Sequence, residues 1–157
     1  MNLSKKQMTN IIIIALALLA FWALTKLRNP AVNFQEDAEG GIQFHKGTWA
    51  EAIAKAQKEN KPIFMDIYAT WCGPCKQLKK YTFADKGAGE FFNQNFINVA
   101  LDGEQPEGAD LAQKFEIMGY PTLIFFDKNG NVLQKSPGFR PPADLIKLGK
   151  SIKESMK

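Results

Sequence analysis

The run at residues 62–68, Pro-Ile-Phe-Met-Asp-Ile-Tyr, leads directly towards Cys72 and Cys75, the only two cysteines of the chain. Such a short, apolar and β-rich run predicts a buried strand. If a helix begins at or near Cys72, the spacing of three positions places both sulfurs on one face, close enough to form a bond. The pattern therefore predicts a strand–turn–helix unit that carries redox chemistry.

The two cysteines have different predicted roles. The first turn of a helix favours a thiolate, because its backbone N–H groups are unpaired and carry partial positive charge. Cys72 is therefore the candidate nucleophile and Cys75 the candidate resolving thiol. Pro74 is tolerated in a first turn, and Gly73 removes a side chain beside the attacking sulfur. This arrangement leaves the sulfur open to a partner protein.

The motif Trp-Cys-Gly-Pro-Cys-Lys at 71–76 follows a strand, and Gly-Tyr-Pro-Thr stands far downstream at 119–122. Together these motifs resemble the thioredoxin family, over a span from about residue 42 to the C-terminus. The resemblance implies an α/β, thioredoxin-like fold with a central mixed β-sheet flanked by helices. It also implies that no cofactor is needed beyond a redox-active disulfide between Cys72 and Cys75.

Transferred residue by residue, the resemblance makes Cys72 the attacking group and Cys75 the resolving group. It also implies positions that border the site or form the substrate groove, with a cis peptide bond ahead of the proline: Trp71, Tyr120, Pro121 and Gly138. The segments 82–95 and 102–108 resemble thioredoxin-like domains of bacterial envelope thiol-reducing systems more than small cytosolic thioredoxins.

Asp66 stands six residues before Cys72 and matches the buried acid of that family. A carboxylate in a strand of apolar neighbours is a proton acceptor, able to deprotonate Cys75 as that thiol attacks a mixed disulfide. The alternative is a salt-bridged strand residue. Many thioredoxins place a lysine near this acid, and the predicted strand at 96–101 contains none.

Other uses of the cysteine pair fit the sequence less well. A structural zinc site needs about four nitrogen or sulfur ligands, and the chain offers two cysteines and His45. We therefore predict no metal. A purely structural disulfide is the second alternative, but so short a ring removes little entropy from the unfolded chain. His45 lies in an alternating segment, 42–45, which predicts an edge strand with a half-exposed histidine.

Residues 11–24 are an unbroken apolar run, preceded by Lys5 and Lys6 and followed by Lys26 and Arg28. We expect residues 1–28 to form a signal anchor with a transmembrane helix, which reaches a sufficient length over 8–27. The alternative is a cleaved signal peptide and a secreted domain. Residues 29–41 lack apolar periodicity and predict a linker to a domain at 42–157.

The net charge of +4 resides in the N-terminal segment, because residues after 28 contain 16 basic and 16 acidic side chains. A nucleic-acid partner is therefore not expected, since it would need a basic patch on the folded domain.

Periodicity and turn residues predict the remaining elements. In chain order they are a helix that Thr48 and Glu51 begin as a capping box and that ends before residue 62, helices at 75–81 and 86–95, a strand at 96–101, a polar spacer at 102–108, a short helix around 111–115, strands at 122–126 and 131–134, and a final helix from 141.

The sequence thus predicts a membrane-tethered thiol–disulfide oxidoreductase on the periplasmic side of a bacterial inner membrane. Gly-Pro between the cysteines resembles reducing members of the family, so we expect a protein-disulfide reductase. It would draw electrons from a membrane thiol donor and reduce disulfide-bearing proteins. Disulfide oxidase or isomerase activity is the alternative within this class. A non-catalytic module that binds unfolded or cysteine-bearing chains is the alternative outside it.

Overall fold

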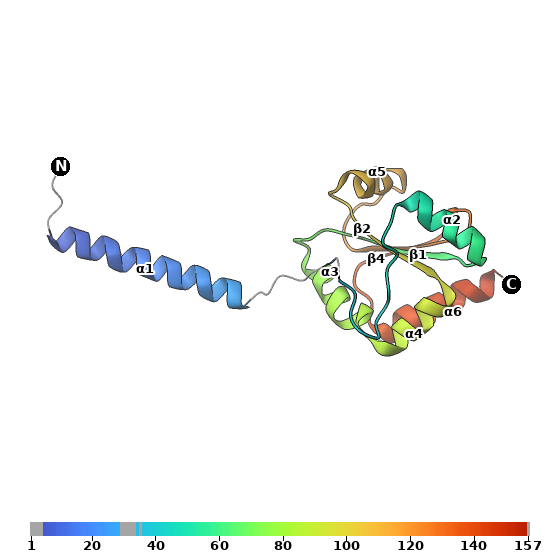
Figure 1. The fold of residues 1–157 in the computed structure, drawn as a ribbon, viewed down its shortest axis with the longest axis horizontal. Coiled ribbons are helices and arrows are strands. Elements are labelled where there is room, and N and C mark those ends of the chain that lie inside the picture. The colour runs from blue at the N-terminus through green and yellow to red at the C-terminus, as the bar shows by residue number, and fades with distance from the viewer. Residues whose placement is uncertain (1–4, 29–33, 35, 157) are drawn as a thin grey trace. The chain divides into compact units, whose positions relative to one another are not determined.

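The structure, a computed structural model, describes residues 5–28, 34 and 36–156. The chain divides into two compact units, residues 1–31 and 32–157 (Figure 1). Of the expected linker, residues 29–33 and 35 lie outside the described residues. The described positions 34 and 36–41 belong to the second unit.

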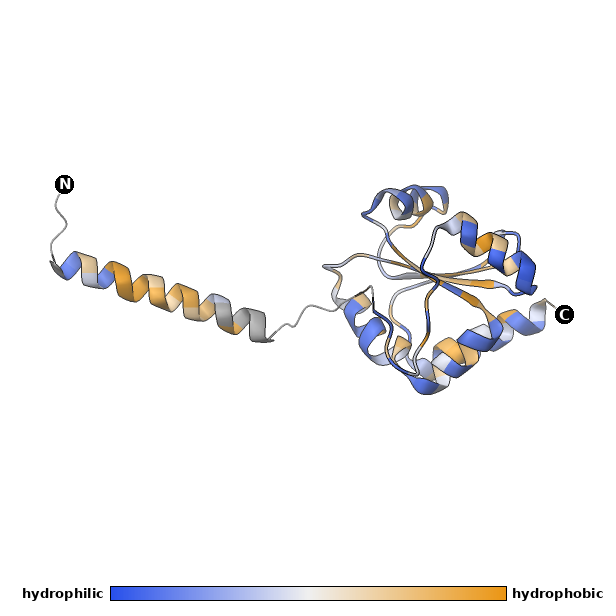
Figure 2. Ribbon diagram, viewed as in Figure 1, coloured by the Kyte–Doolittle hydropathy of each residue, from blue (hydrophilic) through white to orange (hydrophobic). Residues whose placement is uncertain are grey.

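The first unit contains one helix, α1 (Lys5–Arg28). Its large apolar side chains between Met8 and Leu24 are exposed wherever they are described, and they colour the middle of the helix orange in Figure 2. No helix among the described residues is both long enough and apolar enough to cross a membrane.

The second unit is an α/β domain built on four strands. The strands are β1 (Ile63–Tyr68), β2 (Ile97–Asp102), β3 (Thr122–Phe126) and β4 (Val132–Pro137). The helices are α2 (Trp49–Glu59), α3 (Gly73–Gln77), the π-helix η1 (Leu78–Phe83), α4 (Lys86–Asn95), α5 (Pro106–Lys114) and α6 (Pro142–Ser155). The predicted fold class, a mixed sheet flanked by helices, is confirmed for this domain.

The sheet has the strand order β2-β1-β3-β4. Strand β1 is parallel to β2 and antiparallel to β3, and β3 pairs with β4 as an antiparallel hairpin. All six residues of β1 are buried, as expected for a central strand covered on both faces. The strand that leads to the cysteine pair therefore lies in the interior of the sheet.

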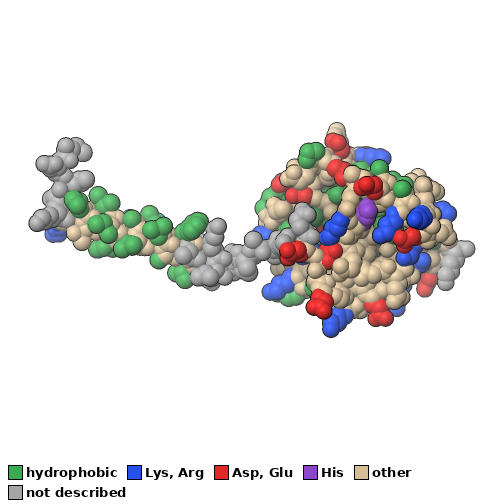
Figure 3. Space-filling view, viewed as in Figure 1, with side chains coloured by type: hydrophobic (Ala, Val, Ile, Leu, Met, Phe, Trp, Pro, Cys, Tyr) green, Lys and Arg blue, Asp and Glu red, His purple; other side chains and the backbone are tan. Residues whose placement is uncertain are grey.

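Alternation along the strands sends side chains to two separate cores. On one face, Phe64 and Phe125 pack against η1, α4 and α6, through Phe83, Phe92 and Leu145. The opposite face carries strand residues that pack against α2 and α5: Ile63, Met65, Ile67, Val99, Ile124 and Phe126. Figure 2 shows the result, with apolar strands between helices whose outer faces are hydrophilic. On the face in view in Figure 3, basic and acidic side chains are interspersed.

Helix α2 begins as predicted. The Glu51 backbone N–H donates to Thr48 Oγ1 at 3.3 Å, and the Thr48 backbone N–H donates to Glu51 Oε2 at 2.7 Å. These two bonds satisfy donors that a helix start otherwise leaves unpaired.

Several elements differ from the sequence prediction. The polar spacer is shorter than expected, because Pro106 begins α5, and proline suits a first helical position. The helix after the cysteine pair begins at Gly73 and continues into the π-helical turn η1. Residues 42–45 are not an edge strand, because their backbone groups bond to different elements. The Ile42 N–H donates to the Phe83 carbonyl, and the His45 N–H donates to the Asn98 carbonyl. The Phe44 N–H donates to the Asp37 carboxylate.

Candidate redox site at the end of strand β1

Cys72 and Cys75 form a disulfide just beyond the end of β1, with their Cα atoms 5.3 Å apart. Cys72 occupies the N-cap position of α3, and the backbone N–H of Cys75 donates to Cys72 Sγ at 3.1 Å. After reduction, the same N–H favours the anionic form of Cys72, because a charged acceptor makes the stronger hydrogen bond. The geometry thus suits Cys72 as the nucleophile.

In this disulfide form the cysteines are almost covered, with Cys72 3% and Cys75 1% exposed. The expected opening exists beside them, since a Cβ atom at Gly73 would contact nothing within 4 Å. Trp71, the residue before Cys72, is 65% exposed. Its indole N–H donates to Glu104 Oε1 at 2.8 Å, and its ring meets the Tyr120 ring edge-on at 6.2 Å.

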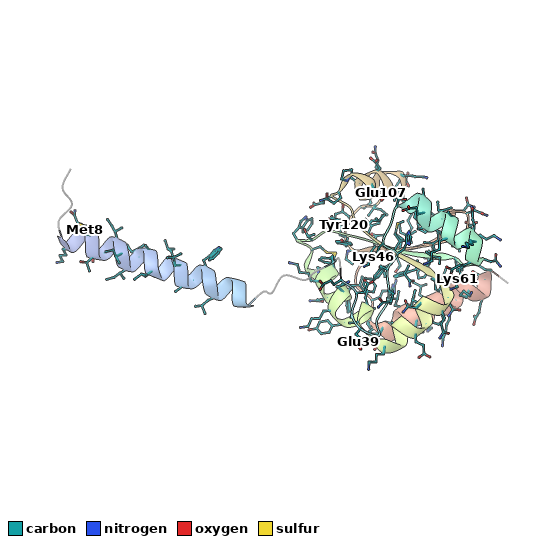
Figure 4. All side chains as sticks on the ribbon, in the orientation of Figure 1. Met8, Glu39, Lys46, Lys61, Glu107 and Tyr120 are labelled. Atoms are coloured by element: carbon teal, nitrogen blue, oxygen red, sulfur yellow. A yellow bond between two sulfur atoms is a disulfide. The ribbon has the colours of Figure 1, made fainter. Side chains whose placement is uncertain are left out.

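The loop ahead of β3 completes the site. The Tyr120–Pro121 peptide bond is cis, as the family resemblance implied. Tyr120, labelled in Figure 4, packs against the cluster that contains both cysteines. The Pro121 carbonyl accepts the Gly138 N–H at 2.8 Å, and Gly138 has a φ of 86°, which favours glycine. The fold therefore brings Tyr120, Pro121 and Gly138 together.

Asp66 lies in the middle of β1, between Ala100 of β2 and Leu123 of β3. Asp66 shares a face of β1 with Phe64, which lies in the phenylalanine-rich core, and with Tyr68, which packs in the cluster of the two cysteines. The residue is 2% exposed, and its Oδ1 atom has no hydrogen-bond partner among the described residues. Burial raises the pKa of Asp66 to about 8, and the positive charge of Lys79 opposes that rise. A carboxyl group titrating near neutrality can both accept and return a proton.

Four residues near the site were not identified from the sequence. Tyr68 and Phe34 stack with ring centres 4.3 Å apart, and both belong to the cysteine cluster. Burial, Asp102 and Asp66 raise the pKa of Tyr68 to about 12. Lys79 and Asp37 form an ion pair at 3.6 Å. For Lys79 a signal existed, because it stands four positions after Cys75 and hence one helical turn away.

Among the described residues, no group of three or more His, Cys, Asp and Glu side chains is placed to hold a metal ion.

The domain thus combines a disulfide at a helix N-terminus, a buried acid in the preceding strand and a cis-proline in the loop before β3. Residues 49–153 match the thioredoxin-like domain family. The chain belongs to that family, whose members work through a redox-active disulfide and without a further cofactor.

Curated relatives point to the same class. The chain is 36% identical over 94 residues to the thiol:disulfide interchange protein DsbD of Yersinia pestis (strain Pestoides F), a match covering 58% of this chain and 16% of that protein. The DsbD protein of Citrobacter koseri is 30% identical over 131 residues, which are 82% of this chain and 23% of that protein. The chain thus spans less than a quarter of the length of these relatives.

Two solved structures show the same fold. A putative disulphide-isomerase from Bacteroides thetaiotaomicron superposes with a TM-score of 0.65 at 37% identity, over 76% of this chain and 98% of that one. The oxidised C-terminal domain of Neisseria meningitidis DsbD superposes with a TM-score of 0.57 at 22% identity, over 70% and 97% of the two chains.

Proposed function

We propose that this protein reduces disulfides of extracytoplasmic proteins through a Cys72/Cys75 dithiol–disulfide cycle. The observation that carries the proposal is the Cys72–Cys75 disulfide that follows β1, the strand whose centre holds Asp66, a buried carboxyl group with an unpaired oxygen among the described residues. Such a group can accept the proton of a thiol that reacts inside the protein.

The cycle has two exchanges. The Cys72 thiolate attacks one sulfur of a substrate disulfide, forms a mixed disulfide and releases the first substrate thiolate, which takes a proton from solvent. Cys75 then loses its proton to Asp66, and its thiolate attacks Cys72 Sγ. This forms the Cys72–Cys75 bond and breaks the bond to the substrate. The departing substrate thiolate receives the proton from Asp66, and two electrons have passed from the protein to the substrate.

The roles of the two cysteines are tested with single variants of the full chain. Cys75→Ser is expected to accumulate mixed disulfides with a disulfide-bearing protein, because the resolving attack is lost. Cys72→Ser, the matched control, is expected to trap none. Equal trapping by both variants would reverse or remove the assigned roles. The trapped proteins also identify the substrates.

The direction of electron flow is tested by the reduction potential of the full chain in dithiothreitol and glutathione buffers. A value near about −270 mV, typical of thioredoxin, supports a reductase, whereas one near about −120 mV is typical of enzymes that introduce disulfides. The similarity to DsbD proteins supports a thiol protein as the electron donor. We further propose that this donor is in the membrane.

Disulfide isomerisation is the second candidate, because the relative at 37% identity is described as a putative disulphide-isomerase. Isomerisation needs only the attack of Cys72, since a substrate thiol can break the mixed disulfide. Cys75→Ser would then retain the ability to repair a protein with scrambled disulfides. Loss of that repair would exclude an isomerase mechanism that uses Cys72 alone.

We also propose that the N-terminal segment anchors the domain on the periplasmic side of a bacterial inner membrane. Support comes from the sequence, in which an apolar run at 11–24 lies between Lys5-Lys6 and Lys26. Alkaline extraction of membranes is expected to leave the full chain in the pellet and to release a chain that begins at residue 32. A shortened, soluble product from the full chain would instead indicate a cleaved signal and a secreted domain.

A further inference from the structure

Near the start of the domain, Asp37 forms ion pairs with two lysines, Lys46 and Lys79. Its side chain is 7% exposed, and its Oδ2 atom accepts the Phe44 N–H at 3.0 Å. The same oxygen lies 3.1 Å from Lys46 Nζ, while Oδ1 lies 3.6 Å from Lys79 Nζ. The lysines differ in burial, since the side chain of Lys46 is 58% exposed and that of Lys79 is 11% exposed. Lys79 is therefore the better covered of the two cations, and Asp37 supplies its counter-charge.

Lys79 lies on the Asp66 side of the sheet. It belongs to η1, which packs through Leu78 and Phe83 into the same core as Phe64. Asp66 shares that face, because it stands two residues after Phe64 in β1. The Lys79 ammonium also lies 5.7 Å from the centre of the Phe44 ring, in that same core.

The charges of Lys79 and Asp66 act on each other. Burial lowers the pKa of Lys79, and Asp37 and Asp66 both oppose this effect, whereas Lys46 adds to it. Burial raises the pKa of Asp66, and Lys79 opposes that rise. The other titratable group that interacts with Asp66 is Tyr68. Lys79 is thus the cation that makes the Asp66 carboxylate easier to form.

We propose that Lys79 and Asp37 are positioning residues for the release of substrate, with Asp37 holding the Lys79 ammonium where it supports the carboxylate form of Asp66. The proposal rests on the proposed function, because it assigns Asp66 the proton of Cys75. Asp37 lies ahead of residues 49–153, the part of the chain matched to the family. The ion pair therefore ties the segment before the family domain to the chemistry inside it.

The proton step shows why the cation matters. Cys75 transfers its proton to ionised Asp66, attacks Cys72 Sγ and breaks the bond to the substrate, and the substrate thiolate then takes the proton. Only the ionised fraction of Asp66 can start this step. A rise of one pH unit in the midpoint of Asp66 reduces that fraction about tenfold at pH 7. A neutral residue at position 79 should therefore slow substrate release without changing the cysteines.

The test is a pH titration of the Asp66 carboxyl carbon by NMR in the reduced full chain. Lys79→Met is expected to raise the Asp66 midpoint by about one pH unit, as is typical of losing one nearby opposite charge. Lys79→Arg keeps the charge and should restore the midpoint. Lys80→Met is the matched control, since Lys80 is the exposed neighbour in the same turn. An Asp66 midpoint that is the same in Lys79→Met and Lys80→Met would overturn the proposal.

The second readout is the rate at which a preformed Cys72 mixed disulfide releases its substrate. In Lys79→Met this rate should fall about tenfold at pH 7 and recover at high pH, where Asp66 ionises regardless. A loss that persists at every pH would indicate a structural defect and overturn the positioning role.

Asp37→Asn should move the Asp66 midpoint upward by a smaller amount, because Lys79 loses its counter-charge and turns towards solvent. An unchanged midpoint in this variant would overturn the part assigned to Asp37.

The titration and the redox tests fail independently. A shifted midpoint in a protein that reduces no disulfide would support the positioning role and contradict the proposed function. A protein that reduces disulfides and whose Asp66 midpoint is unshifted in Lys79→Met would support the proposed function and contradict the positioning role.

Discussion

Asp66 and Asp37 are two acids with nearly covered side chains that the domain surrounds in opposite ways. Asp37, in the segment before α2, has the Phe44 N–H and the ammonium groups of Lys46 and Lys79 around its carboxylate. Its Oδ1 atom makes no hydrogen bond among the described residues but lies 3.6 Å from Lys79 Nζ. Asp66, in the centre of β1, has apolar strand neighbours, and its Oδ1 atom has no hydrogen-bond partner among the described residues.

The difference separates a structural acid from a reactive one. Burying a charge costs little when donors and counter-charges replace water, and it costs several kcal/mol when they do not. Asp37 receives that compensation from the Phe44 N–H and from two lysines. For Asp66 the opposing charge is that of Lys79, and burial still raises its pKa to about 8. An acid poised in this way weakens the fold at neutral pH but can exchange a proton with a thiol.

The largest expected effect is that of Asp66→Asn on the pH dependence of stability. Below about pH 4, Asp66 is protonated in both the folded and the unfolded chain and contributes nothing. As the pH rises towards the folded pKa of about 8, the folded chain binds more protons than the unfolded one, so stability falls. At about 1.4 kcal/mol for each pH unit that separates the folded from the unfolded pKa, the loss at pH 8 reaches at most about 5 kcal/mol.

Asparagine removes this titration. The stability of Asp66→Asn relative to the wild type should therefore grow steadily from pH 4 to pH 8, measured by urea unfolding of the oxidised chain. A constant difference across that range would mean that Asp66 keeps an ordinary pKa and would abolish the contrast with Asp37.

The sequence predicted Asp66 and the cysteines because their information is local. The apolar run predicted the strand that contains Asp66. The short spacings from Asp66 to Cys72 and from Cys72 to Cys75 predicted that the cysteines follow the end of that strand. The pairing of β1 with β2 and β3 then followed from the fold class. The capping box at Thr48 is equally local, and helix α2 begins where it predicts.

The surroundings of Asp66 were missed because they depend on tertiary contacts. A lysine was sought in the strand at 96–101, whereas the cation comes from η1, at Lys79. The segment at 29–41 was expected from its composition to be a linker. Within it, the Phe34 ring stacks on the Tyr68 ring, and the Asp37 carboxylate pairs with the Lys79 ammonium. No sequence pattern predicts either contact, because each is made by a single residue of a segment that lacks apolar periodicity.

The second prediction concerns Asp37→Ala at pH 7. The change leaves the Lys79 ammonium, on a side chain that is 11% exposed, without its counter-charge and the Phe44 N–H without its acceptor. The free energy of unfolding should fall by about 2–3 kcal/mol, because removing one partner of a buried pair leaves the other uncompensated. Urea unfolding of the full chain measures it. Asp37→Ala as stable as the wild type would show that Asp37 is no more structural than Asp66.

The smallest effect is expected from Lys46→Ala, and it sharpens the comparison because Lys46 lies closer to Asp37 than Lys79 does, at 3.1 Å against 3.6 Å. Lys46, labelled in Figure 4, is 58% exposed, so water and salt screen its charge. Its removal should change the free energy of unfolding by no more than about 0.5 kcal/mol. The Asp66 midpoint should stay unchanged, since Lys46 is not among the charges that shift the pKa of Asp66. A loss as large as that of Asp37→Ala would mean that distance, not burial, ranks the ion pairs of this domain.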